Sequence, residues 1–239
     1  MNLNWFDTHY YNLLYKNRNE KEAQLFIDHI LEKIKIKPNS KVLDLACGTG
    51  RHSKYLEKKG FNVVGVDKSE KNIFIAKKNE NKSLKFFNQE MTTDINMKFD
   101  VVFNFFTSFG YSNDKYNHDT VENISKNLKP GGLFVIDFLN SELVRKNIVK
   151  SDKKFIRGIN FNISRFIKNN CIYKNISFKD KNQQYNFTEK VMLLNLFDFK
   201  KYFSKNNFKI LEIFGDYDLS IFKIEKSPRL ILIAKKNPT

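Results

Sequence analysis

The sequence predicts an α/β fold in which a doubly wound, mostly parallel sheet carries a smaller antiparallel sheet inserted late in the chain. Between residues 41 and 138, short apolar strands alternate with amphipathic helices in the order β-α-β-α-β-β-α-β. This alternation is typical of a doubly wound sheet. After about residue 150 the helical spacing disappears and three strand patterns follow one another. Consecutive strands joined by short turns predict an antiparallel meander.

The first half of the chain divides into elements by its apolar spacing. A helix is predicted over residues 20–36, because apolar side chains recur there at intervals of three and four residues. Gly60 is typical of a helix end and Ser69 of a helix start. The other strands and helices of this half are predicted at 42–45, 51–59, 62–66, 70–79, 84–87, 99–106, 115–128 and 133–138.

The second half contains the predicted insertion and the end of the main sheet. Its strands are predicted at 161–168, 171–179, 184–194, 209–214 and 230–234, with a helix at 197–205. The last two strands favour a reversed seventh strand at the edge of the main sheet. We therefore expect an N-terminal helical lid (1–37), a main α/β domain (38–149 plus 195–239) and an inserted antiparallel β-sheet (150–194).

Composition limits the compartment and the partners. The net charge of +16 is of the kind that marks nucleic-acid or membrane-surface binders. However, six of the 42 basic residues are arginine, the residue that reads phosphates and base edges, and the lysines are scattered. We therefore interpret the charge mainly as a solvated surface.

No apolar run is long enough to cross a membrane, no signal peptide is evident, and the two cysteines are far apart. These features predict a cytoplasmic protein.

The segment from Val42 to Gly50 carries the strongest functional signal. It places Gly48 and Gly50 in a turn between a buried strand and a helix, where doubly wound folds bind cofactors. Asp67 ends the next strand, at the spacing from Gly48 that lets a carboxylate meet ribose hydroxyls. The dinucleotide fingerprint requires a third glycine where this chain has Ser53, which disfavours NAD and FAD.

Asp44 indicates the charge of the ligand. A carboxylate four residues before Gly48 would repel a pyrophosphate, but it suits a ligand that carries an ammonium group. S-adenosylmethionine (SAM) is such a ligand. The alternative is an ordinary tight turn with a solvent-facing acid.

Four ordered motifs carry a family resemblance. They are D-L-A-C-G-T-G (44–50), V-G-V-D (64–67), F-D-V-V-F-N-F-F (99–106) and L-K-P-G-G-L-F-V-I-D (128–137). The series resembles class I SAM-dependent methyltransferases and covers residues 41–138. This resemblance implies a Rossmann-like sheet of seven strands. The chain is also similar to small-molecule N-methyltransferases of the glycine N-methyltransferase and deoxyaminosugar N,N-dimethyltransferase type, through Y-x-x-R at 15–18, A-C-G-T-G and the late insertion.

The resemblance implies residues for the methionine end of SAM. Asp44 and the backbone of Ala46 and Gly48 would meet that end, with Gly50 completing the loop. Asn104, which ends the fourth strand, would lie near the transferring methyl group.

It also implies residues for the nucleoside end of SAM. Asp67 would hold the ribose hydroxyls, and Lys68 would lie beside the adenine. Glu90 and Met91 match the acid–methionine pair that flanks adenine, although the family more often has Asp in place of Glu90.

The N-terminal lid contributes two further residues by resemblance. Tyr15 and Arg18 match lid residues that hold the cofactor carboxylate. Tyr11 lies four residues before Tyr15 on the same helix face, so the two rings are predicted to cover the acceptor and exclude water. The alternative for both is an aromatic stripe packed on the sheet.

Other candidates lie on the acceptor side. Tyr111 follows the fourth strand, so it would orient an amine or take its proton, unless it is a packed loop aromatic. Asn140 would face the acceptor, and Arg165 would hold an acidic group of it. Asp137 and Asn140 resemble a divalent-metal pair, but no third ligand is evident, so we expect no metal.

These observations predict a SAM-dependent methyltransferase that acts on a small molecule at nitrogen or oxygen. A monomer or a homodimer would suffice. The alternative is an RNA or other nucleic-acid methyltransferase, favoured by the charge. Residues 104–107 lack the Asn/Asp-Pro-Pro-aromatic motif of base-amino methyltransferases, which argues against that chemistry. A third class, a non-catalytic SAM-binding subunit, is disfavoured by the intact cofactor motif.

Overall fold

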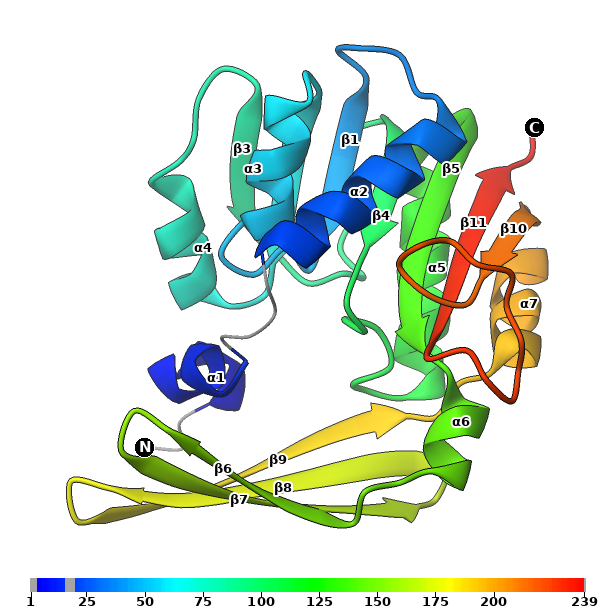
Figure 1. Ribbon diagram of the computed structural model, residues 1–239. Helices are drawn as coiled ribbons and strands as arrows, with labels where there is room; N and C mark the ends of the chain where they lie inside the picture. Colours follow the sequence, from blue (N-terminus) through cyan, green and yellow to red (C-terminus); the bar gives the residue numbers. More distant parts are fainter. Residues whose placement is uncertain (1–3, 16–19, 239) are drawn as a thin grey trace.

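A computed structural model describes residues 4–15 and 20–238, and Figure 1 shows two sheets, a large one and a small one, with helices around the larger. The large sheet has seven strands in the order β10-β11-β5-β4-β1-β2-β3. Its strands are β1 (Lys41–Leu45), β2 (Asn62–Asp67), β3 (Leu84–Asn88), β4 (Phe99–Asn104), β5 (Leu128–Leu139), β10 (Phe208–Phe214) and β11 (Arg229–Lys236). The predicted α/β fold class is confirmed.

One detail of the large sheet corrects the expectation from sequence. Strand β11 runs antiparallel to both β5 and β10, so it is the reversed strand. It lies between those two strands, and β10 forms the edge. Its buried apolar run, Leu230–Ala234, fits this inner position, because a strand with neighbours on both sides and helices nearby has little exposed surface.

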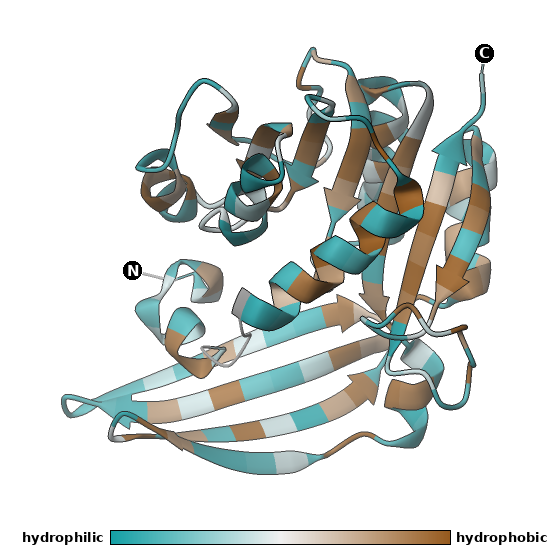
Figure 2. Ribbon diagram, turned by 45° about the horizontal axis from the view of Figure 1, so that its top comes forward, coloured by the Kyte–Doolittle hydropathy of each residue, from teal (hydrophilic) through white to brown (hydrophobic). Residues whose placement is uncertain are grey.

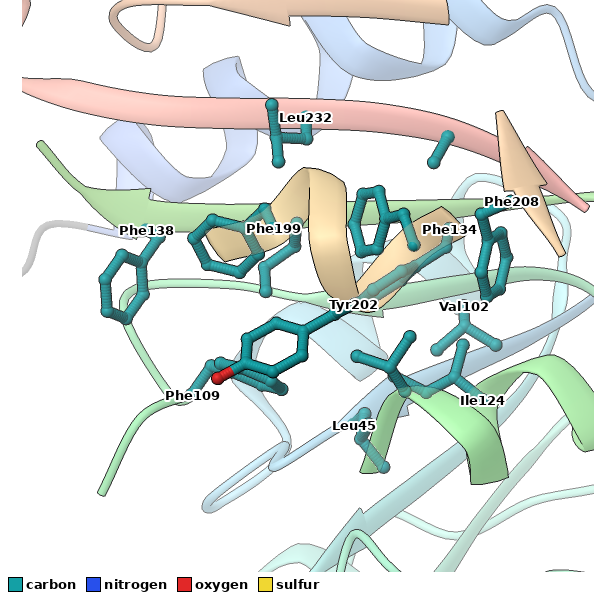
Figure 3. Close-up of a cluster of buried hydrophobic side chains, with 14 of the residues drawn as sticks. Leu45, Val102, Phe109, Ile124, Phe134, Phe138, Phe199, Tyr202, Phe208 and Leu232 are labelled. Atoms are coloured by element: carbon teal, nitrogen blue, oxygen red, sulfur yellow. The ribbon is translucent and has the colours of Figure 1, made fainter. Parts of the chain in front are cut away.

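Helices cover both faces of this sheet. They are α2 (Glu20–Ile34), α3 (Arg51–Lys58) and α4 (Glu70–Lys77) on one face, and α5 (Asp114–Asn127) and α7 (Leu196–Lys205) on the other. Alternate strand residues supply the two cores, because successive side chains of a strand point to opposite faces. Val42 therefore packs with α2, and Leu43 packs in the core on the α5 and α7 face. Figure 3 shows the second core, where Phe134 and Phe199 lie between sheet and helix.

The inserted sheet has four antiparallel strands, one more than the sequence predicted. They are β6 (Ser151–Ile156), β7 (Ile159–Lys168), β8 (Cys171–Asp180) and β9 (Gln183–Met192), preceded by the short helix α6 (Ser141–Lys146). Strand β6 was missed because it is an edge strand in which no residue is fully buried. It therefore lacks the apolar alternation that marks the other three, whose banding is visible in Figure 2.

The N-terminal segment, residues 4–15, packs against the inserted sheet. It forms a 3-10 helix, η1 (Trp5–Asp7), and α1 (His9–Leu14), which begin at the caps Asn4 and Thr8. Trp5, Tyr10 and Leu14 share a core with apolar residues of β7 and β8. Helix α2, which the sequence assigned to the same lid, packs instead on the large sheet. The division into three domains stays a prediction.

No helix in the described residues has both the length and the apolar character that a membrane crossing requires.

Candidate functional site

The glycine loop after β1 forms one wall of the candidate site. Ala46, Gly48 and Gly50 have φ values of 62°, 56° and 80°, which is the left-handed region that favours glycine. A Cβ on Gly50 would lie 2.6 Å from Phe86 Cζ, so packing requires glycine there. A Cβ on Gly48 would meet no atom within 4 Å. The loop is therefore open at Gly48, where a ligand can approach the backbone.

Asp44 lies beneath this loop with 1% of its surface exposed. Burial raises its pKa to about 6, while a hydrogen bond from Ser53 Oγ at 2.6 Å lowers it and the negative charge of Asp67 raises it further. Ser53 is the residue that interrupts the dinucleotide fingerprint. Its role here is to hold the Asp44 carboxylate, and the sequence analysis did not anticipate this.

Asp67 closes the loop from the neighbouring strand. Its Oδ2 accepts the Gly48 N–H and its Oδ1 accepts the Ser69 N–H, both at 2.8 Å. Burial raises the pKa of Asp67, and the two N–H donors oppose that shift. The structure therefore brings Gly48 and Asp67 into direct contact, because β1 and β2 are adjacent parallel strands that end at the same edge. Whether the remaining lone pairs of Asp67 hold a ribose stays a prediction.

A cavity of about 320 Å³ lies in front of the loop. It brings together the glycine loop, the N-terminal segment and the residues after β4. Its lining includes Tyr11, Asn12, Tyr15, Asp44, Ala46, Gly48, Arg51, His52, Phe106 and Ser108. The predicted lid residues Tyr11 and Tyr15 therefore share one cavity with the predicted cofactor loop. Arg18 lies outside the described residues.

Tyr15 is also part of a polar group on the inserted sheet. Its hydroxyl donates to Glu189 Oε1 at 2.6 Å and accepts from Lys174 Nζ. The Lys174 ammonium lies 4.3 Å from the centre of the Tyr15 ring. The position of Tyr15 is thus set by the insertion as well as by its own helix.

The predicted adenine residues lie beyond β3. Glu90 is exposed, and its carboxylate accepts a hydrogen bond from the Tyr116 hydroxyl of α5. The backbone carbonyl of Met91 accepts from Asn123 Nδ2 at 2.8 Å. Lys68 is exposed beside Asp67. Helix α5 therefore orients Glu90 and Met91, and spacing along the chain does not reveal the contact between Tyr116 and Glu90.

Asn104 ends β4 in a fully buried position. Its Nδ2 donates to the Leu45 carbonyl at 2.9 Å. Its Oδ1 is buried, and none of the hydrogen-bond donors in the described chain reaches it. A buried carbonyl oxygen without a donor costs free energy. This oxygen is therefore suited to accept a contact from a bound ligand.

A strained turn follows β4. Phe106 and Thr107 are consecutive non-glycine residues with φ of 57° and 58°. Asp137 holds the turn, because its Oδ2 accepts the Phe106 N–H at 2.8 Å. Arg229 Nε donates to Asp137 Oδ1 at 2.7 Å, and Arg229 Nη2 donates to Thr107 Oγ1 at 2.8 Å. The Phe106 ring stacks on His52 with an interplanar angle of 11°. The ion pair thereby sets one wall of the cavity.

This pairing bears on the metal question. Asp137 is engaged by Arg229, a role that the sequence analysis did not foresee. Within the described residues, one group of possible metal ligands lies elsewhere, on α5, as His118, Asp119 and Glu122. Lys115 and Lys126 form ion pairs with those two acids. The expectation that no metal is used stays a prediction.

The remaining acceptor-side candidates have structural partners. Tyr111 is half-buried, and its ring packs edge-on against Phe6 of the N-terminal segment at 5.4 Å. Asn140 caps α6, and its Nδ2 donates to the carbonyls of Ile224 and Ser227. Arg165 pairs with Asp152 at 3.4 Å on the inserted sheet. Tyr111 therefore contacts the N-terminal segment, whereas the side chains of Asn140 and Arg165 are held by other partners. All three assignments stay predictions.

Part of the sequence is similar to known methyltransferases. Residues 42–132 match a protein family described as a methyltransferase domain. Glycine N-methyltransferase of Mus musculus is 34% identical over 122 residues, which make up 44% of this chain and 42% of that protein. The chain spans about half the length of most of the curated relatives that it matches.

Solved structures show the same fold over nearly the whole chain. A SAM-dependent methyltransferase from Clostridium acetobutylicum superposes with a TM-score of 0.81 at 20% identity, covering 95% of this chain and 96% of that one. An amino pentose methyltransferase from Micromonospora echinaspora, solved with SAM bound, gives a TM-score of 0.73 at 16% identity and covers 99% of both chains.

Proposed function

We propose that this chain is a class I SAM-dependent methyltransferase and that it transfers a methyl group from SAM to a small-molecule acceptor, a proposal supported by the match over residues 42–132 and by the shared fold. The proposal rests chiefly on one observation. A buried carboxylate, Asp44, and a partly buried one, Asp67, flank an open glycine loop. Among the described residues, no lysine or arginine forms an ion pair with either carboxylate. Such a site favours a cationic ligand, and SAM carries both an ammonium and a sulfonium charge.

The residues of the site fit SAM. Asp44 and the backbone of Ala46 and Gly48 would hold its methionine end, and Asp67 would hold its ribose. Glu90 and Met91, ordered by α5, would flank the adenine. The buried Oδ1 of Asn104, which lacks a donor in the described chain, would meet the region of the reacting methyl group.

The chemistry needs little more than orientation. When bound, SAM supplies a methyl group on a positively charged sulfur that is activated for in-line displacement by nitrogen or oxygen. The chain's own residues then bind, align and exclude water. Tyr11 and Tyr15 would cover the cavity, and Tyr111 would orient the acceptor or take its proton if the acceptor arrives protonated.

The acceptor is proposed to be a small molecule modified at nitrogen or oxygen. The N-terminal segment and the inserted sheet, which share a core, would enclose it. The amino pentose methyltransferase and glycine N-methyltransferase among the similar proteins are named for small acceptors. An RNA acceptor is the second candidate, and the net charge of +16 favours it.

The test is label transfer from methyl-tritiated SAM into a host-cell extract, separated by a small-pore filter and treated with RNase. We expect label in the filtrate, where mass spectrometry can identify the acceptor. Label retained by the filter and released by RNase would favour the second candidate. No SAM-dependent label in any fraction, together with no SAM binding by calorimetry, would refute the proposed activity.

A further inference from the structure

The loop between β10 and β11 (residues 215–228, Figure 1) places one aromatic side chain beside the wall of the candidate site. Some of this loop is well exposed, as Ile221 shows with 78% of its surface accessible. Tyr217, in contrast, is half-buried, and its ring lies 5.3 Å from that of Phe106 and 4.7 Å from that of Phe26. Phe106 lines the cavity in front of the glycine loop, so Tyr217 is one ring contact away from that cavity.

The backbone around Tyr217 is held by its own loop and by α2. Asp216 Oδ1 accepts the N–H groups of Asp218 and Ser220 at 3.1 and 2.9 Å, so a tight turn carries Tyr217. The carbonyl oxygen of Tyr217 lies 2.8 Å from Nδ1 of His29 on α2. A carbonyl can only accept, so this ring nitrogen is the donor. The position of Tyr217 is therefore fixed relative to the helix that covers this face of the sheet.

The hydroxyl of Tyr217 joins the ion pair that holds the turn after β4. It donates to Asp137 Oδ2 at 3.3 Å, the same oxygen that accepts the Phe106 N–H. The guanidinium of Arg229 lies 5.6 Å from the centre of the Tyr217 ring. Burial raises the pKa of Tyr217 and the negative charge of Asp137 adds to that shift, so the hydroxyl stays a donor at neutral pH. Tyr217 therefore supports the turn twice, through Asp137 and through the ring of Phe106.

We propose that Tyr217 is a positioning residue, which holds the ring of Phe106 against His52 and thereby sets the wall that a ligand bound at the glycine loop meets. Phe106 and Thr107 have left-handed backbones, which non-glycine residues adopt at a cost, so the turn persists only where its surroundings hold it.

The contacts of the Phe106 ring show what Tyr217 would control. This ring stacks on His52 at 4.9 Å, and the guanidinium of Arg51 lies 5.0 Å from its centre. Phe106, His52 and Arg51 all line the cavity. Loss of the Tyr217 ring would let Phe106 turn away from His52, and the shape of the cavity would change. The binding part of this inference rests on the proposed use of SAM.

The experiment has two readouts on the whole chain, calorimetry with SAM and the proton NMR signals of the His52 ring. The chain has four histidines, so a comparison with His52→Gln assigns these signals. Tyr217→Leu removes the ring and the hydroxyl, and it should bind SAM about tenfold more weakly, because the wall no longer fits the ligand. The His52 signals of the ligand-free protein should also move, since the ring current of the stacked Phe106 acts on them. Tyr217→Phe keeps the ring and should return both readouts close to the wild type.

Tyr202→Leu is the matched control. The Tyr202 hydroxyl also donates to an aspartate, Asp114, and its ring also packs edge-on against a phenylalanine, Phe199. However, this core lies on the opposite face of the sheet from Phe106. Tyr202→Leu should lower the midpoint of thermal unfolding at least as much as Tyr217→Leu, since Tyr202 is the more buried of the two, and should keep SAM affinity within about threefold of the wild type.

Two results would overturn the inference. One is a Tyr217→Leu variant in which either the SAM affinity or the His52 signals stay as in the wild type. The other is a Tyr202→Leu variant that loses SAM affinity as strongly as Tyr217→Leu, because the loss would then follow from stability alone. If the wild type binds no SAM, the proposed function fails, and the His52 signals alone decide whether Tyr217 holds Phe106.

Discussion

Two neighbouring places at the same edge of the large sheet use aspartates in opposite ways. At the ends of β1 and β2, Asp44 and Asp67 are held by a hydroxyl and by backbone N–H groups. At the end of β5, Asp137 is held by the guanidinium of Arg229. The first arrangement keeps the negative charge in place without neutralising it, and the second neutralises it. The difference distinguishes the site that we propose for a cationic ligand from an ion pair that shapes the backbone turn beside that site.

Breaking this ion pair should have the largest effect. Arg229→Met leaves Asp137 buried without its cation, and we expect the free energy of unfolding to fall by about 3 kcal/mol. Urea denaturation measures this loss. Lys129→Met is the control, because its partner Asp100 is partly exposed and such pairs contribute less than about 1 kcal/mol. Equal losses in the two variants would mean that Asp137 and Arg229 act as an ordinary surface pair.

Removing the Asp67 carboxylate should have a smaller effect on stability and a large one on SAM binding. Asp67→Ala should weaken SAM about 100-fold or more, since charge-assisted hydrogen bonds to the ribose are lost. The circular dichroism spectrum should stay that of a folded protein. Calorimetry measures the affinity, and wild-type affinity in this variant would refute the ribose assignment.

The role of Asp44 can be tested through the pH dependence of stability and of SAM affinity. Burial raises the pKa of folded Asp44 to about 6, above its unfolded value of 3.8. Between these values the folded state binds more protons, so this group makes the ligand-free protein less stable as pH rises from 4 to 6. SAM affinity should change in the opposite sense, falling about tenfold per unit below pH 6 as the carboxylate is neutralised.

Titrating SAM by calorimetry between pH 5 and 8 tests this expectation, with Asp44→Asn as the control. The variant should bind weakly and show a flatter profile in this range. A second variant, Ser53→Ala, removes the hydrogen bond that lowers the pKa of Asp44, so its midpoint should move to higher pH. A profile that is the same in wild type and Asp44→Asn would show that another group controls the dependence.

The contact between Gly48 and Asp67 was predictable because it follows from adjacent parallel strands. Strand ends in such a sheet meet at one edge, so spacing along the chain translates into proximity. The pairing of Arg229 with Asp137 was not predictable, because the two residues are 92 positions apart and meet only through the reversed β11. Strand β6 was not predicted for a local reason, because this exposed edge strand lacks the apolar alternation that marks a half-buried strand.

The N-terminal segment also has a consequence for how the protein folds during its synthesis. Trp5 and Glu189, whose hydrogen bond fastens the N-terminal segment, are separated by 184 positions in the chain. During synthesis the first residues leave the ribosome early, but they have no docking surface until most of the chain has followed. The strands of the large sheet from β1 to β5 can assemble before that moment. The glycine loop would therefore form early in folding, and the N-terminal segment would dock over that loop in one of the last steps.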